Sequence, residues 1–135
     1  MATTVADDKQ AAKEFDFEYL SLKLVNLSMD GELYKAKDVE VTLHLDLPGK
    51  SYSGKAACNS FFGSLEVIGE DAIKFLPGGS TEMMCEAEAM QWQARVFNAL
   101  IGHTFNVTNR KDNATLTQVD GSIMLAFEKV ESIQE

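Results

Sequence analysis

Apolar and polar residues alternate along most of this chain, in short runs separated by only a few residues. The clearest run is residues 38–47, in which one face is entirely apolar: Val39, Val41, Leu43, Leu45 and Leu47. This two-residue period predicts half-buried β-strands. Parallel neighbours need a connection of about a dozen residues or more, and the early connections are shorter. The sequence therefore predicts an antiparallel sheet.

Turn residues separate the remaining alternating runs. The predicted strands are residues 15–27, 38–47, 51–57, 64–68, 72–76, 103–108, 114–119 and 122–130. Asp120-Gly121 lies between the last two strands, and this dipeptide predicts a two-residue type I′ turn with positive φ angles. The last two strands should therefore form a hairpin.

The hydrophobic period changes once along the chain. Between Cys85 and Ile101, apolar residues recur every three or four positions in two adjacent rows. This spacing predicts an amphipathic α-helix. Glu86 and Glu88 suit the positive end of its dipole, and Gly102 is a residue type that commonly ends helices. The fold class is therefore α+β, with one main helix packed on an antiparallel sheet.

The length of 135 residues is that of a single domain. Residues 1–14 are small, polar and charged without apolar periodicity, so we expect a flexible N-terminal tail. Residues 15–135 contain no linker rich in Pro, Gly or Ser. We expect them to form one domain.

The net charge of −9 makes this an acidic protein. Such a field repels nucleic-acid phosphates and anionic lipids, so we expect no nucleic-acid binding. No apolar run approaches the roughly 20 residues of a spanning helix, and no secretion signal is visible. We therefore expect a cytoplasmic protein without membrane insertion.

The four side chains best suited to metal binding or nucleophilic catalysis are scattered singly: His44, Cys58, Cys85 and His103. Their spacing fits no zinc motif, and no base adjoins Cys58 in the sequence. We expect two buried free thiols, no metal or cofactor, and no enzymatic activity. A disulfide between Cys58 and Cys85 stays open, because the sequence does not place the two residues relative to one another. On the polar face of its strand, His44 is expected to be a solvated or cross-strand partner.

Small residues surround the first cysteine in the stretch Ser53–Ser64. Small side chains fit where two layers approach closely, and Asn59 tolerates a left-handed turn. Gly54 and Gly63 would mark a bulge or a bend where the sheet curls. We therefore interpret this stretch as structural rather than reactive.

These residues also carry a resemblance to a known family. The motif residues are Gly54, Cys58, Asn59 and Gly63, followed by Thr81, Met84, Cys85 and an amphipathic helix. The pattern resembles the META/HslJ domain family, although Glu86 stands where members commonly have proline. The resemblance implies a curled antiparallel sheet or open barrel packed by one helix. It also implies a function known only loosely, with bacterial members linked to stress response and trypanosomatid members to virulence and secretory processes. An acidic chain without a lipoprotein cysteine resembles the trypanosomatid proteins more.

Two functions remain open at this stage. The first is a non-catalytic module that binds an unidentified protein partner. Strand alternation places Phe61 and Phe62 on opposite faces, which makes this pair the candidate interaction surface. The alternative is a carrier of a small apolar ligand, in a cavity between sheet and helix lined by Met83, Met84, Met90 and Phe97.

Overall fold

The computed structural model describes residues 17–130, so the predicted tail at 1–14 lies outside the described residues. This part of the chain folds into ten strands and one helix. The elements are β1 (Tyr19–Met29), β2 (Glu32–Lys35), β3 (Val41–Asp46), β4 (Ser51–Ala56), β5 (Asn59–Ile68), β6 (Ala72–Phe75), β7 (Gly79–Ser80), α2 (Ala87–Leu100), β8 (Thr104–Asn109), β9 (Asn113–Gln118) and β10 (Ile123–Lys129).

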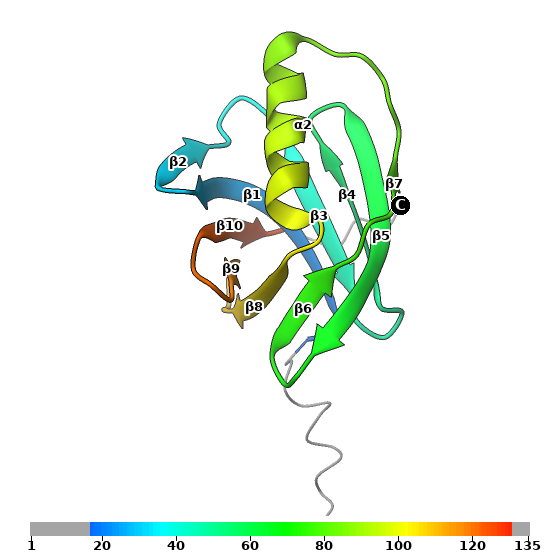
Figure 1. The fold of residues 1–135 in the computed structure, drawn as a ribbon, viewed down its shortest axis with the longest axis vertical. Helices are drawn as coiled ribbons and strands as arrows, with labels where there is room; N and C mark the ends of the chain where they lie inside the picture. The colour runs from blue at the N-terminus through cyan, green and yellow to red at the C-terminus, as the bar shows by residue number, and fades with distance from the viewer. Residues whose placement is uncertain (1–16, 131–135) are drawn as a thin grey trace, which may run out of the picture.

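Eight of the strands within residues 17–130 form a closed barrel (Figure 1). The order around it is β1, β3, β4, β5, β6, β8, β9 and β10, and β10 pairs with β1 to complete the circle. Every pairing between these strands is antiparallel, which confirms the predicted sheet type. The short strands β2 and β7 extend the sheet beside β1 and β5.

The expected curled sheet or open barrel is corrected to a closed barrel. Closure depends on β1, which pairs with β3 through Tyr19–Lys23 and with β10 through Leu22–Met29. A register shift between Leu24 and Asn26 marks a bulge in this strand. Bulges bend a strand and increase its twist. This bend helps β1 to pair with both β3 and β10. Closure also leaves none of these eight strands with a free edge.

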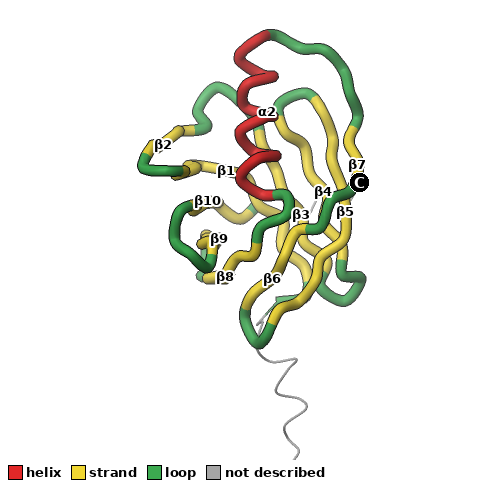
Figure 2. The backbone as a smooth tube through the Cα atoms, viewed as in Figure 1, coloured by secondary structure: helices red, strands yellow, loops and turns green. Residues whose placement is uncertain are grey.

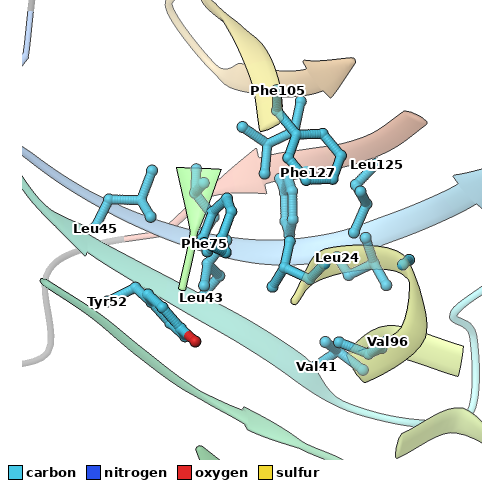
Figure 3. Packing of buried hydrophobic residues seen from close by; sticks show 14 of the residues in the cluster. Leu24, Val41, Leu43, Leu45, Tyr52, Phe75, Val96, Phe105, Leu125 and Phe127 are labelled. Carbon is cyan, nitrogen blue, oxygen red and sulfur yellow. The ribbon is translucent and has the colours of Figure 1, made fainter. Parts of the chain in front are cut away.

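The helix α2 lies in front of the barrel strands in Figure 1, with β1, β2 and β10 to one side and β4, β5 and β7 to the other. Its buried residues are Trp92, Val96, Ala99 and Leu100. Trp92, Val96 and Leu100 belong to the predicted stripe, whereas Ala99 does not, and the predicted Ala94 is exposed. The predicted helix at 85–101 is therefore confirmed to within two residues at each end. One core joins barrel and helix, and Figure 3 shows Val96 beside Val41 and Leu24.

The strand predictions differ from the structure in several places. β1 spans Tyr19–Met29 rather than 15–27, and β3 spans Val41–Asp46 rather than 38–47. β5 begins at Asn59 rather than at residue 64, so the cysteine motif itself runs directly into a strand. β2 and β7 were not predicted, because four and two residues are too few to show a period. The last hairpin is confirmed, but its type I′ turn is wrong, because only Gly121 has a positive φ angle. Asp120 instead accepts a hydrogen bond from the Ser122 backbone N–H.

None of the helical segments within residues 17–130 has the length and apolarity needed to cross a lipid bilayer.

Candidate functional site

The cysteine motif forms the turn between β4 and β5. Ala56 pairs with Asn59, so Ala57 and Cys58 form a two-residue connection. Ala57 has a φ angle of 63°, a left-handed conformation that is uncommon for a residue other than glycine. The sequence suggested Asn59 for the left-handed position, but the structure has Ala57 there. The turn places Cys58 next to the start of α2.

Gly54 and Gly63 each lie opposite an aromatic residue on the neighbouring strand. Gly54 pairs with Phe61, and Gly63 pairs with Tyr52. A methyl group added to Gly54 would overlap the carbonyl oxygen of Thr42 and lie 2.9 Å from the Phe61 ring. One added to Gly63 would lie 2.6 Å from Tyr52 Cζ. The register is continuous here, so the predicted bulge is wrong, and the glycines instead leave room for the rings.

Cys58 and Cys85 form a disulfide, with their Cα atoms 6.6 Å apart. The expectation of two free thiols is therefore wrong, because the β4–β5 turn meets the residues that precede α2. The bond closes a separation of 27 residues, and the loop-entropy model gives about 3.5 kcal/mol of stabilisation for such a loop. Disulfides are rare in the reducing cytoplasm. The bond is therefore unusual for a cytoplasmic protein, which is the location that the sequence predicts.

Asn59 is fully buried and organises a hydrogen-bond network beside the disulfide. Its Nδ2 donates to Met83 O at 3.0 Å and to Gln93 Oε1 at 2.6 Å. Its Oδ1 accepts from the Met83 backbone N–H at 2.7 Å and from Thr81 Oγ1 at 2.8 Å. Thr81 Oγ1 in turn accepts from the Ser60 backbone N–H at 3.0 Å. One side chain thus joins the barrel, the helix and the chain between them.

The segment from Pro77 to Glu86, called here the 77–86 segment, connects β6 to α2. Figure 2 shows that most of it is a loop running from β7 to the start of the helix. Three sets of contacts hold it: the pairing of β7 with β5, the bonds to Asn59, and the disulfide at Cys85. The side chain of Met84 is nevertheless 87% exposed. The other motif residues serve the scaffold, whereas the Met84 side chain faces solvent.

A pocket of about 280 Å³ lies between the 77–86 segment, β5 and the end of α2. Its aromatic lining residues are Tyr52, Phe61, Phe62 and Phe97, and its charged one is Glu82. Phe61 is buried, with its ring 5.4 Å from that of Phe97, whereas Phe62 is 55% exposed. This confirms that the two rings face opposite sides. The predicted cavity lining is wrong in part, because Met83, Met84 and Met90 do not line this pocket.

The Tyr52 hydroxyl fixes one wall of this pocket by donating to Leu76 O at 2.6 Å. Burial raises the pKa of this hydroxyl above its ordinary value. Tyr52 therefore stays neutral and keeps its donor near neutral pH. The wall it forms is an uncharged aromatic surface.

A second hollow, of about 310 Å³, lies around the disulfide at the other end of the 77–86 segment. Four carboxylates line it together with Cys58 and Cys85: Asp38, Glu40, Glu86 and Glu88. We call it the acidic hollow. No lysine or arginine within residues 17–130 lines it.

The two histidines lie apart from these features, each with its own partner. His44 Nδ1 is 3.0 Å from Ser21 Oγ on the adjacent strand, which confirms the cross-strand role. His103 Nδ1 is 3.0 Å from Gln118 Nε2. Near it, the Ser122 backbone N–H and hydroxyl, followed by the charge of His103, hold the pKa of Asp120 below its usual value. No nucleophile, base and orienting acid are brought together by these contacts.

Sequence reasoning missed Gln93 and Tyr52 as members of the site. Gln93 is a polar residue at a stripe position of the helix, and such a residue needs a hydrogen-bond partner when it is buried. A glutamine at an apolar position of the helix stripe is a signal that could have identified Gln93 as part of a hydrogen-bond network. Tyr52 gave no signal, because its role depends on Leu76 and Gly63, which pair with it only in the folded barrel.

The chain was compared with known proteins. Residues 21–131 match the model of the META domain. A solved structure, described as the NMR structure of the protein from Burkholderia xenovorans, has a TM-score of 0.70 and 22% sequence identity, and covers 90% of this chain and 89% of that one. At this identity the likeness shows a shared fold. No curated protein matches the chain. The family match spans most of the sequence and contains both cysteine motifs, so the chain belongs to the META domain family.

Proposed function

We propose that this domain is a non-catalytic protein-interaction module whose aromatic pocket, with Phe62 at its rim, takes an apolar side chain of a partner protein. The observation that carries the proposal is an exposed phenylalanine beside a pocket with aromatic walls, on a surface held in place from several sides. From the META/HslJ resemblance, we propose stress response, virulence or secretion as the process served.

The fixed position of the 77–86 segment supports this proposal. A disulfide, a buried asparagine and a strand pairing restrain the backbone beside the pocket. A surface that is already ordered loses less conformational entropy when a partner binds. Met83 and Met84 are both exposed on the same segment, and methionine adapts its shape to different partners.

The size of the pocket suits a side chain or a compact ligand better than a lipid-sized molecule. Small-molecule sites usually enclose about 300–1,000 Å³, and this pocket has about 280 Å³. A lipid-sized molecule would extend well beyond it. The alternative function, a carrier of a small apolar ligand, therefore applies only to compact ligands in this same pocket.

Photo-crosslinking in cells tests the proposal. A benzoylphenylalanine at position 62 should crosslink to a protein partner, and one at position 33 should not. Leu33 is the matched control, because its exposed fraction of 55% equals that of Phe62. The substitution Phe62→Glu should abolish recovery of the crosslinked partner by a probe at position 84, whereas Leu33→Glu should not.

Equal crosslinking from positions 62 and 33 would contradict the proposal. Native mass spectrometry of the purified chain distinguishes the alternative function. A small bound mass that disappears after Phe97→Ala, together with no protein crosslink at position 62, would favour the ligand carrier.

A further inference from the structure

We infer that the partner segment is cationic, with an apolar anchor for the aromatic pocket and lysine or arginine side chains for the acidic hollow. This inference rests on the proposed function and adds the chemistry of the partner. It follows from the charges at the two ends of the 77–86 segment.

The formal charges lining both hollows have one sign. Glu82 is the charged residue of the aromatic pocket, and the acidic hollow adds Asp38, Glu40, Glu86 and Glu88. In the described part of the chain, neither lining contains lysine or arginine. The basic residue of α2, Arg95, lies over the rings of Tyr34 and Trp92, at 4.2 and 5.0 Å from their centroids. It therefore does not neutralise the acidic hollow.

Three kinds of occupant could cover the two hollows: a second copy of the chain, one of its own ends, or a separate partner. Their charges distinguish them. A second copy of the chain carries the same net charge of −9 and would bring like charges together. Residues 1–16 contain four acidic and two basic side chains, and residues 131–135 contain two glutamates and no basic residue. Neither end of the chain complements the hollow. A separate partner with positive charge does.

The spacing of the two hollows sets the spacing of the partner's groups. Glu82 in the first hollow and Glu86 in the second are four residues apart in the sequence, and four residues span at most about 14 Å. In an extended partner segment, the basic groups should therefore follow or precede the apolar anchor by no more than about four residues. Exposed charge pairs add modest affinity individually but increase the association rate together, most strongly at low salt.

Three synthetic peptides of twelve residues test the inference against the isotope-labelled full chain by NMR titration. The first carries one phenylalanine and two lysines three and four positions away. The second replaces both lysines with glutamate, and the third replaces the phenylalanine with alanine. We expect the first to shift the resonances of Gly79, Phe62, Glu86 and Glu88, and to bind at least about tenfold more tightly than either of the others at low salt.

Charge-reversal variants locate the effect. Glu86→Lys with Glu88→Lys, and separately Asp38→Lys with Glu40→Lys, should each weaken binding of the lysine peptide about tenfold. The pair on the β5–β6 hairpin, Glu66→Lys with Glu70→Lys, changes the net charge by the same amount at exposed positions outside the hollow and should leave binding within about twofold. The pair Asp38 and Glu40 lies outside α2. Weaker binding in this second variant therefore cannot come from a destabilised helix.

Two results would overturn the inference. One is equal binding of the lysine and glutamate peptides, and the other is an equal effect of the hollow variants and the hairpin variant. Crosslinking from position 62 separates this failure from failure of the proposed function. If that crosslink persists while the hollow variants have no effect on partner recovery, the docking surface stands and the cationic partner is rejected.

Discussion

Removing the Asn59 side chain should cost the domain a large part of its stability. Asn59→Ala deletes four hydrogen bonds, to Met83 O, Met83 N, Gln93 Oε1 and Thr81 Oγ1. Each such bond contributes about 1 kcal/mol, and a buried group left without a partner costs about 1–3 kcal/mol. Water reaches part of this network, because Met83 and Thr81 belong to an exposed segment. We therefore take about 1 kcal/mol per bond and expect a loss of about 4 kcal/mol.

Urea unfolding followed by fluorescence measures this loss. Trp92 is the single tryptophan and is buried in the native helix, so its emission reports the transition. No reductant is added, so that the disulfide is intact in every variant. The expected loss is large beside the total of about 5–15 kcal/mol that is typical of native domains. Asn106→Ala is the matched control, because Asn106 is exposed on β8 and should change the stability by less than about 0.5 kcal/mol.

Two further variants divide the network. Gln93→Ala removes one acceptor and should cost about 1 kcal/mol, because Asn59 Nδ2 keeps its bond to Met83 O. Asn59→Asp keeps one acceptor oxygen but replaces the amide donor with a carboxylate oxygen. That oxygen faces Met83 O and Gln93 Oε1, which accept hydrogen bonds from the asparagine. Those oxygens and burial raise the folded-state pKa of the new carboxyl, so its stability should fall as the pH rises through that pKa. A loss below about 1 kcal/mol in Asn59→Ala would refute the assigned role of the network.

Three other predictions follow from particular contacts. Because four carboxylates surround the Cys58–Cys85 disulfide, raising the salt to 1 M should slow its reduction by cationic cysteamine and speed its reduction by anionic thioglycolate, each relative to neutral mercaptoethanol; the same change in reduction rate with salt for all three reagents would contradict this. Gly54→Ala should destabilise the chain by about 3 kcal/mol, and more than Gly63→Ala, because the added methyl meets a strand backbone rather than the Tyr52 ring; urea midpoints in the reverse order would refute that reading. Arg95→Ala should cost about 1 kcal/mol in urea unfolding through the lost cation–π contacts with two aromatic rings, and Arg95→Lys less; equal losses would show that the ring contacts contribute nothing specific to arginine.

The parts of the fold that repeat with a regular period could be predicted from the sequence. The run around Val41, Leu43 and Leu45 became β3, and the stripe containing Trp92 and Val96 became α2. In both elements the apolar period follows the burial of one face, so the local sequence contains the necessary information.

Closure of the barrel could not be predicted in the same way. It depends on pairing between β1 and β10, such as Leu22 with Lys129, which lie at opposite ends of the described chain. No local pattern records which strand edge meets which. The bulge at Val25 could not be predicted either. It allows β1 to pair with both β3 and β10, and no local pattern shows that these strands are its neighbours.

The motif that identified the family was predicted to be structural, and its chemistry was only partly foreseen. Gly54 and Gly63 were expected to mark a bulge or a bend, but the register is continuous and aromatic rings lie beside both glycines. The disulfide was not expected, because the decision between thiols and a bond requires the distance between Cys58 and Cys85. That distance is set by two turns and a helix start, none of which the sequence places relative to one another.

The use of the motif in the scaffold has a consequence for function. The buried Asn59 side chain bonds to other parts of this chain, and the disulfide, which lines the acidic hollow, joins the β4–β5 turn to the 77–86 segment. What they accomplish is to hold the 77–86 segment against the barrel with Met84 facing outward. Under the proposed function, recognition of a partner depends on residues beside the motif, such as Phe62 and Glu86. Substitutions at these neighbouring positions should then change partner binding without changing the fold.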